Sequence, residues 1–246
     1  MFAVVRARLT PRSGCFQTAD YLKRRLLRRR FYHMDIGEFH FFNPYAETRE
    51  TENRLPHWQQ TDAVYFITFR LRDAVPAHLR SQWESEREIW LRFHPEPWGS
   101  EVESEYHKRF SGAIERWLDA GHGSCVLRRP DCTKIVAKAI RYFDGERLAM
   151  ISTIVMPNHV HAVFVQNSEH PLEKLIRSWK PYTARKINEL HGRTGGLWQR
   201  DYFDRLVRDE QHLANCVRYI RRNPEKARLQ SREYILYESE FAKTIE

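Results

Sequence analysis

Two histidines near the middle of the chain have a spacing that could support joint chemistry. His159 and His161 are separated by one residue inside an apolar, β-branched run over residues 154–165, and such a run predicts a buried strand. Residues i and i+2 of a strand project from the same face, so both imidazoles are expected to point the same way. Neutral imidazole nitrogens are good ligands for divalent metals. The pair therefore predicts half of a metal site, whose other ligands must come from elsewhere in the chain.

A tyrosine and an asparagine in the C-terminal third could complete such a site. Tyr219 and Asn223 lie four positions apart in a segment that starts at Asp209 and repeats apolar residues at helical spacing, so both are expected on one flank of a helix. An amide oxygen can bind a hard divalent cation, and a phenol can act as a nucleophile. From periodicity alone, purely structural roles for these two residues are more common. A tyrosine beside an apolar stripe usually packs against the core, and an asparagine before a proline usually ends a helix.

Other uses of a His-x-His pair fit the sequence poorly. No Asp-x-x-His follows to suggest a binuclear hydrolase, and no His-x-Glu with Cys-x-x-Cys suggests a deaminase. The four cysteines show no Cys-x-x-Cys spacing, so free thiols are expected rather than disulfides or cysteine-bound zinc.

The expected elements alternate between strands and helices. Strands are predicted over 64–71, 148–156, 159–166 and 202–207 from their β-branched and aromatic content. Helices are predicted from Pro76 to before Pro95, over about 101–118, from a cap at Asp131 to Phe143, over 172–190 with a kink or break at Pro181, and from Asp209 to Asn223. This order indicates an α+β fold, with an antiparallel sheet covered by helices.

The domain organisation expected from the sequence is simple. Residues 1–33 form a basic arm with a net charge of +8; it could bind nucleic acid, be disordered or precede the true start at Met34. Residues 34–246 are expected to form a single domain with a helical insertion at about 76–120.

Charge within the expected domain is polarised. The segment 171–228 carries a net charge of +7, whereas the remaining segments outside the arm sum to −6. A local basic surface favours a polyanion such as nucleic acid, although solvated helix faces would give the same composition. No apolar run is long enough for a transmembrane helix, and no signal peptide is recognisable. We therefore expect a cytoplasmic protein with no membrane partner.

Three motifs in order resemble a known family. They are Met156-Pro157-Asn158-His159-Val160-His161, then Trp198-Gln199 with Tyr202-Phe203-Asp204 and Val207-Arg208-Asp209, then Tyr219-Ile220-x-x-Asn223-Pro224. Together they resemble the signature of the REP-associated tyrosine transposases, which belong to the single-tyrosine HUH transposases. The resemblance covers roughly residues 55–229, most of the chain, and the helical region from Pro76 to Leu118 exceeds the most compact members.

The resemblance implies a ferredoxin-like core and metal-dependent cleavage of DNA by a tyrosine. It implies that His159, His161 and Asn223 bind a divalent metal, Mg²⁺ or Mn²⁺. It implies that Tyr219 attacks single-stranded or hairpin-forming DNA at short palindromic repeats and leaves a 5′-phosphotyrosine link. Such an enzyme would be bacterial and nucleoid-associated, and its site could be built within one chain or in a homodimer. The base that accepts the phenolic proton is open, with His212 as one candidate.

The basic segment supplies candidate DNA contacts. They are Arg177, Lys180, Trp198, Arg205, Arg208 and Arg222.

Three alternatives stay open at this point. The same site could serve an HUH replication initiator or relaxase. A domesticated, inactive DNA-binding protein would keep the basic face, but the presence of all four site residues speaks against decay. A metal hydrolase of small molecules would act without Tyr219.

Overall fold

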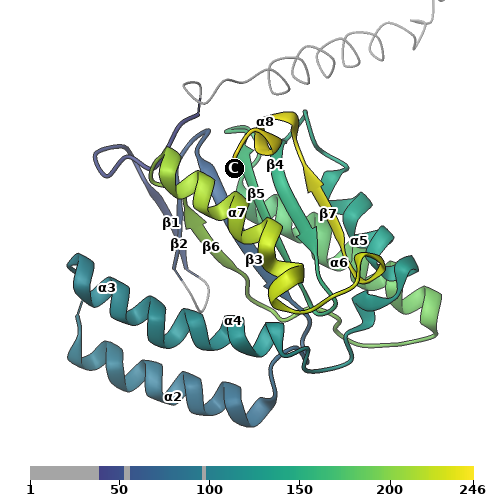
Figure 1. The fold of residues 1–246 in the computed structure, drawn as a ribbon. Coiled ribbons are helices and arrows are strands. Elements are labelled where there is room, and N and C mark those ends of the chain that lie inside the picture. The colour runs from purple at the N-terminus through teal and green to yellow at the C-terminus, as the bar shows by residue number, and fades with distance from the viewer. Residues whose placement is uncertain (1–38, 53–55, 96–97) are drawn as a thin grey trace, which may run out of the picture.

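The computed structural model describes residues 39–52, 56–95 and 98–246, so the predicted basic arm at 1–33 lies outside the described residues. The strands are β1 (Arg49–Glu52), β2 (Pro56–Gln59), β3 (Val64–Arg70), β4 (Leu148–Val155), β5 (His159–Gln166), β6 (Phe203–Leu206) and β7 (Ile235–Glu238). The helices are α2 (Ala77–Phe93), α3 (Ser100–Tyr106), α4 (Gly112–Asp119), α5 (Pro130–Arg141), α6 (Leu172–His191), α7 (Glu210–Lys226) and α8 (Glu240–Lys243). A π-helical segment, His107–Ser111, joins α3 to α4 (Figure 1).

A five-stranded antiparallel sheet is the centre of the fold. Its order is β6-β3-β5-β4-β7, and β1 and β2 form a separate antiparallel pair. Without the insertion α2–α4, the elements from β3 to β6 follow the order βαββαβ with strand order 4-1-3-2. This arrangement confirms the predicted ferredoxin-like, antiparallel α+β fold, to which β7 adds an edge strand.

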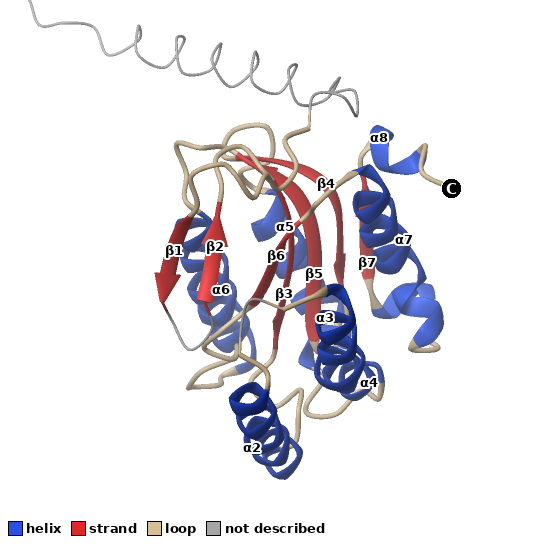
Figure 2. Ribbon diagram, turned by 90° about the vertical axis from the view of Figure 1, so that its left-hand side faces the viewer, coloured by secondary structure: helices blue, strands red, loops and turns tan. Residues whose placement is uncertain are grey.

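Helices cover both faces of the sheet. Figure 2 shows α5 and α6 on one side and α7 on the other. The strand residues alternate accordingly, as expected from the two-residue period of a strand: Val160 and Phe164 join the core under α5 and α6, whereas Val163 and Val165 join the core under α7. His159 and His161 have the parity of the second set, so they face α7.

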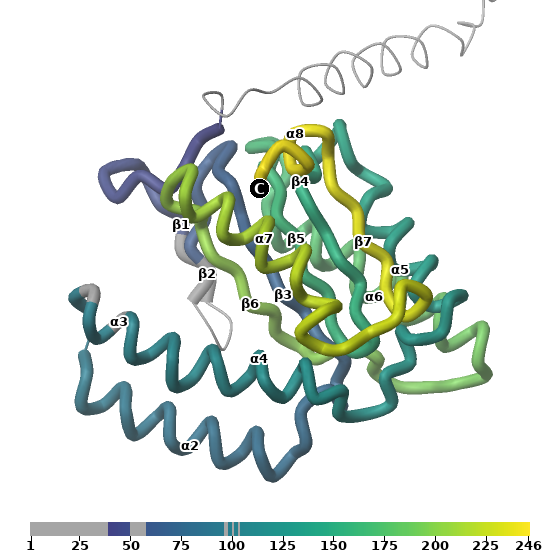
Figure 3. The backbone as a smooth tube through the Cα atoms, viewed as in Figure 1, coloured from purple at the N-terminus to yellow at the C-terminus, as the bar shows by residue number. Residues whose placement is uncertain are grey.

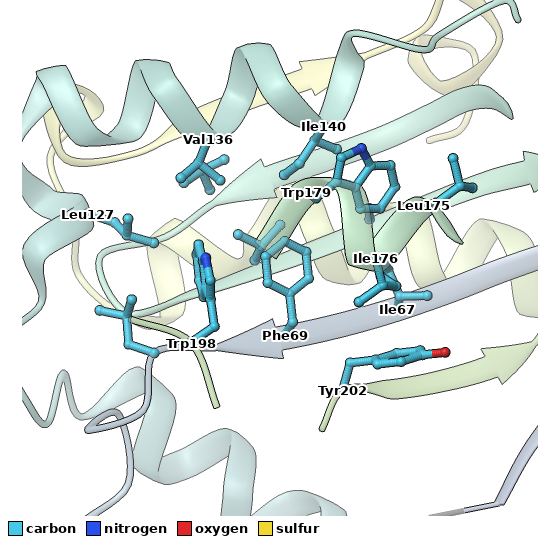
Figure 4. Packing of buried hydrophobic residues seen from close by; sticks show 14 of the residues in the cluster. Ile67, Phe69, Leu127, Val136, Ile140, Leu175, Ile176, Trp179, Trp198 and Tyr202 are labelled. Carbon is cyan, nitrogen blue, oxygen red and sulfur yellow. The ribbon is translucent and has the colours of Figure 1, made fainter. Parts of the chain in front are cut away.

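The core under α5 and α6 contains large aromatic side chains (Figure 4). Trp179 of α6 is only 1% exposed and meets Phe164 edge to face, with ring centroids 6.0 Å apart. Phe69 packs against Trp198 in the same way at 4.9 Å. This cluster fixes α6 on the sheet.

Several predicted boundaries are wrong, and the reasons are local. Arg129, rather than Asp131, occupies the N-cap of α5, with Pro130 at its first position. Pro181 does not divide α6, and α7 continues past Pro224 to Lys226. A proline removes one hydrogen bond from a helix, and the buried apolar stripe of each helix outweighs that loss here.

The helical insertion predicted at about 76–120 forms α2, α3 and α4. These helices lie beneath the end of the sheet at which β3 finishes (Figure 3). Within the residues that the structure covers, no helix combines the length and apolarity needed to cross a bilayer.

The contribution of the aromatic core can be measured. Trp179→Ala should lower the free energy of unfolding by about 3–5 kcal/mol, because it removes a buried ring and leaves a cavity. Tyr182→Ala, on the same helix but 45% exposed, should change it by less than about 0.5 kcal/mol. Urea denaturation of both variants checks this, and equal losses would contradict the packing described here.

Candidate active site

The pairing of β3 with β5 holds the two histidines in place. Arg70 pairs with His159 and Thr68 with His161 in the antiparallel register. Both imidazoles are buried, 1% and 2% exposed, and their ring centroids lie 4.6 Å apart. The two rings therefore sit side by side on one face, as the sequence predicted.

A hydrogen bond to Nδ1 orients each ring. His159 Nδ1 lies 2.7 Å from Asn158 Oδ1, and His161 Nδ1 lies 2.7 Å from Thr68 Oγ1. An amide oxygen is only an acceptor, so the Asn158 contact places the His159 proton on Nδ1 and leaves the lone pair on Nε2. This outer-shell arrangement is typical of metal-binding histidines.

Asn158 also ties the histidine strand to the insertion. Its side-chain amide donates to the carbonyl of Leu118, at the end of α4, over 3.1 Å. Its backbone carbonyl accepts from the amide of Leu71 over 2.8 Å. One buried residue thus links the end of β3, the start of β5 and the last turn of α4.

Tyr219 of α7 lies directly against the histidine pair. Its hydroxyl is 3.4 Å from His161 Nε2, and the two ring centroids are 5.1 Å apart. Phe66 stacks on the His161 ring at 5.5 Å and meets Tyr219 edge to face at 5.9 Å, so the three rings contact one another. The structure therefore brings Tyr219 to the histidines within a single chain.

Asn223 lies one helical turn further along α7 and is fully buried. Its side-chain oxygen and nitrogen have no hydrogen-bond partner in the described part of the chain, and neither does His159 Nε2. Buried polar atoms without partners are costly. The Asn223 oxygen and His159 Nε2, together with His161 Nε2, make up a donor set that fits a divalent cation.

Burial keeps both imidazoles neutral. Removal from water lowers the pKa of His159 to about 3, with Asn223 opposing the shift and the charge of Arg70 adding to it. Burial also lowers the pKa of His161 well below its usual value, helped by His159 and Lys226. Neutral imidazoles are the form that binds metal.

The phenol of Tyr219 has charged neighbours on two elements. Burial raises its pKa far above the ordinary value, and the nearby carboxylate of Glu115 adds to this shift while Asn223 opposes it. The ammonium of Lys226 lies 4.7 Å from the centre of the tyrosine ring. Glu115 comes from α4, so the insertion adds an acidic group to the site.

Glu115 as a whole residue is exposed to solvent, but its carboxylate group is partly removed from water. Burial of its carboxylate raises its pKa, and the charge of Asp119 raises it further. Lys226, Arg205 and an interaction with the Tyr219 hydroxyl lower it.

His212, the candidate base named from the sequence, lies at the start of α7. Its Nδ1 accepts a hydrogen bond from the backbone amide of Arg208 over 3.2 Å.

The candidate DNA contacts divide into surface and interior positions. Arg177, Arg208 and Arg222 are exposed, and Arg205 is half-buried on β6 with its guanidinium 3.4 Å from His107. Lys180 is buried instead, and its ammonium donates to the carbonyl of Arg200 over 2.7 Å. Trp198 is also buried, with its indole N–H donating to Thr183 Oγ1 over 2.8 Å. The structure gives these two residues internal contacts, so we leave them out of the DNA surface proposed below.

A separate group of potential metal ligands joins α5 to α6. Cys132 Sγ lies 3.0 Å from His191 Nε2, and an Asp131 oxygen lies 3.9 Å from the same nitrogen. Burial raises the pKa of Cys132 to about 11, so its protonated thiol can donate to the imidazole. That hydrogen bond accounts for the contact, which involves neither Tyr219 nor the histidine pair.

The sequence did not assign a role in the site to several residues that contact it. Thr68 and Phe66 have the strand parity that faces the site, and Asn158 immediately precedes the histidine pair. Their roles depend on cross-strand register, which only the structure defines. Glu115 is about 100 positions from Tyr219 in the chain, so no local pattern could have identified it.

Comparison with known proteins connects this geometry to a family. Residues 126–223 match the family model described as "Transposase IS200 like". A Haemophilus influenzae protein named as a REP-associated tyrosine transposase is 30% identical over 87 residues, which is 31% of this chain and 49% of that protein. The chain therefore spans about half the length of this curated relative.

A solved structure of a REP-associated tyrosine transposase bound to a REP hairpin is also similar. It shows 15% sequence identity and a TM-score of 0.39, over 72% of this chain and 73% of that one. The family match spans the histidine strand, α6, β6 and α7 as far as Asn223, and so includes all four site residues. The resemblance predicted from the motifs is confirmed to this extent: residues 126–223 are similar to the IS200-like transposases, and part of the chain is similar to a REP-associated tyrosine transposase.

Proposed function

We propose that this protein is a metal-dependent DNA strand transferase that cuts and rejoins single-stranded or hairpin DNA through Tyr219. The observation that carries the proposal is the 3.4 Å approach of the Tyr219 hydroxyl to His161 Nε2, next to buried polar atoms of His159 and Asn223 that lack partners in the described structure. A tyrosine that only packed would not need unsatisfied ligand atoms beside its hydroxyl.

His159, His161 and Asn223 would hold the divalent ion, Mg²⁺ or Mn²⁺. Relatives of the HUH type generally use such an ion. The amide oxygen is a ligand that hard cations prefer, and neutral imidazoles offer lone pairs to divalent metals. When bound, the ion would neutralise negative charge that develops on the phosphate oxygens. The contacts from Asn158 and Thr68 to the two Nδ1 atoms would leave both Nε2 atoms available to the ion.

In the proposed step, a Tyr219 Oη–phosphorus bond forms as the bond from phosphorus to the 3′ oxygen breaks. The products are a 5′-phosphotyrosine and a free 3′-hydroxyl. Because the phosphotyrosine conserves the bond energy, attack by a 3′-hydroxyl can rejoin DNA without a nucleotide cofactor. Positioning and charge stabilisation could together supply on the order of ten kcal/mol.

The phenol needs help to react, because burial raises its pKa. We propose that the Glu115 carboxylate accepts the phenolic proton and that the 3′ oxygen takes up a proton as it leaves. Lys226, beside the tyrosine ring, would stabilise negative charge on the phenolic oxygen. The insertion would then be part of the catalytic site.

The DNA would approach across the α7 side of the molecule. Arg205, Arg208 and Arg222 lie on β6, after β6 and on α7, and they can contact phosphates. Arg177, which lies exposed on α6, would contact DNA that wraps around the edge of the sheet. The name of the Haemophilus relative supports palindromic repeats as targets, which would place the protein at chromosomal DNA in the cytoplasm.

Loss of the nucleophile should separate binding from chemistry. Tyr219→Phe should abolish the covalent protein–DNA adduct formed with single-stranded oligonucleotides and Mn²⁺, because no hydroxyl remains to attack phosphorus. Binding of the same oligonucleotides should persist. Denaturing gel electrophoresis measures the adduct, with Tyr182→Phe, at an exposed position of α6, as the matched control. An adduct that survives in Tyr219→Phe would refute the assignment, and metal-dependent hydrolysis of small phosphate esters by that variant would favour the hydrolase alternative.

Loss of a histidine should weaken metal binding directly. His161→Ala should reduce Mn²⁺ affinity by at least about 100-fold, beyond the effect typical of an outer-shell partner, as measured by electron paramagnetic resonance of free Mn²⁺. His170→Ala, outside the site, should bind as the wild type does. Unchanged Mn²⁺ binding by His161→Ala would remove the metal role, whatever the activity of the variant.

The proposed base can be tested by its charge. Glu115→Gln keeps the size of the side chain but cannot accept a proton, so adduct formation at pH 7 should slow by about 10²–10⁴-fold with DNA binding retained. Because the pKa of Glu115 is raised, the wild-type rate should fall with decreasing pH already above the usual carboxylate range, and Glu115→Gln should lose this dependence. Asp119→Asn, one turn along α4, is the control. Equal rates for Glu115→Gln and wild type would assign the proton to another group.

A further inference from the structure

An arginine-lined pocket opens where β3 ends and the insertion begins. Its volume is about 410 Å³, and it lies between the segment after β3, the first turn of α2 and the loop after α6. We call it the β3-end pocket. Its lining includes Arg72, Asp73, Arg80, Ser124 and Arg193.

The charges in this pocket are not balanced within the chain. The side chains of Arg72 and Arg193 make no hydrogen bond or ion pair with any residue that the structure describes, and Arg80 only approaches Glu84 at 3.9 Å. Asp73 is the acidic residue in the lining, and its carboxylate accepts from the amide of Ser124 over 2.7 Å. The pocket lining therefore contains three arginines from three separate segments and one carboxylate, which is already hydrogen-bonded.

Arg70 connects the pocket to the active site. It pairs with His159 across β3 and β5, and its guanidinium donates to Gln199 Oε1. The pKa of Arg70 is lowered to about 10, mainly by burial and next by the charge of Arg80. Arg72 follows two residues later, in the turn after β3. Arg70 beside the histidine strand and Arg72 in the pocket lining thus place positive charge at both sites.

The chemistry of the lining indicates which anion fits. The planar guanidinium group matches the oxygen pairs of a phosphate. The lining includes no aromatic side chain on which a base could stack, and stacking is the usual way to hold unpaired bases. The pocket is therefore suited to backbone phosphates rather than to bases, and its contacts would be independent of sequence.

We propose that the β3-end pocket binds backbone phosphates of the single strand that flanks the cleavage point, so that DNA leaving the active site passes under the first turn of α2. The inference rests on the proposed function for the identity of the polyanion. It also gives the insertion two separate roles, because Glu115 would serve the nucleophile while Arg80 would help to hold the flanking strand.

Salt dependence of binding tests the pocket without requiring cleavage. Affinity of full-length protein for fluorescent dT20 is measured by anisotropy over a range of salt concentrations, using wild type, Arg72→Gln, Arg193→Gln and the control Arg92→Gln. Arg92 lies exposed near the far end of α2, paired with Glu88 at 2.6 Å, and its variant loses the same charge. Thermal unfolding monitors folding of each variant.

Each pocket variant should reduce the slope of log Kd against log salt by about 0.7, the value for one lost single-strand phosphate contact, and Arg92→Gln should keep the wild-type slope. Slopes equal to that of Arg92→Gln would overturn the inference. So would the result that inorganic pyrophosphate binds wild type in an Arg72-dependent way but does not compete with dT20, since the pocket would then be a small-anion site.

The two proposals fail in different ways. If wild type forms the Tyr219 adduct while the pocket variants keep the wild-type slope, only the pocket inference fails. If no adduct forms but the slopes fall as expected, the pocket binds phosphates of a single strand, whereas the strand-transfer proposal and the placement of the pocket beside a cleavage point both fail.

Discussion

The packing of α7 across the face of the sheet that carries His159 and His161 is the contact on which the whole site depends. Val217 and Ile220 of the helix pack in one cluster with Val163 and other residues of the sheet. We call this contact the seam; it fixes the position of α7 along the sheet and its rotation about its own axis. Tyr219 and Asn223 then lie at the border of the seam, one facing His161 and the other buried beyond it. Rotation of α7 by one residue, about 100°, would take the phenol away from the imidazoles.

The same burial that positions these groups also sets their charge. The two imidazoles are neutral because they are out of water, and the phenol resists ionisation for the same reason. In the proposed function, such a site would depend on charge brought to it: a cation for the donor atoms, a phosphate for the cation, and a base for the phenolic proton. Lys226, Arg205 and Arg70 surround this neutral centre with positive charge and favour the approach of a polyanion.

The core of the fold was predictable because it is encoded locally. The β-branched runs at β3, β4 and β5 and the apolar stripes of α5 and α7 each specify their own element, and the two-residue period places His159 and His161 on one face. The short strand β7 and helix α8 were missed, since four residues carry little periodic signal. Burial of Lys180 and Trp198 was also missed: both residue types are common on DNA-binding surfaces, and only tertiary packing shows that Lys180 reaches the carbonyl of Arg200 and Trp198 reaches Thr183. The link from Asn158 to α4 and the approach of Glu115 to Tyr219 depend on how the insertion folds back, which no local pattern encodes.

The most direct test of the account is to identify the amino acid that becomes linked to DNA. Wild-type protein is incubated with a labelled single-stranded oligonucleotide and Mn²⁺, digested with protease and nuclease, and analysed by tandem mass spectrometry. The expected result is a nucleotide remnant attached through phosphate to the oxygen of Tyr219, in the peptide from α7. A remnant on any other residue, or cleaved DNA with no covalently modified peptide, would contradict it.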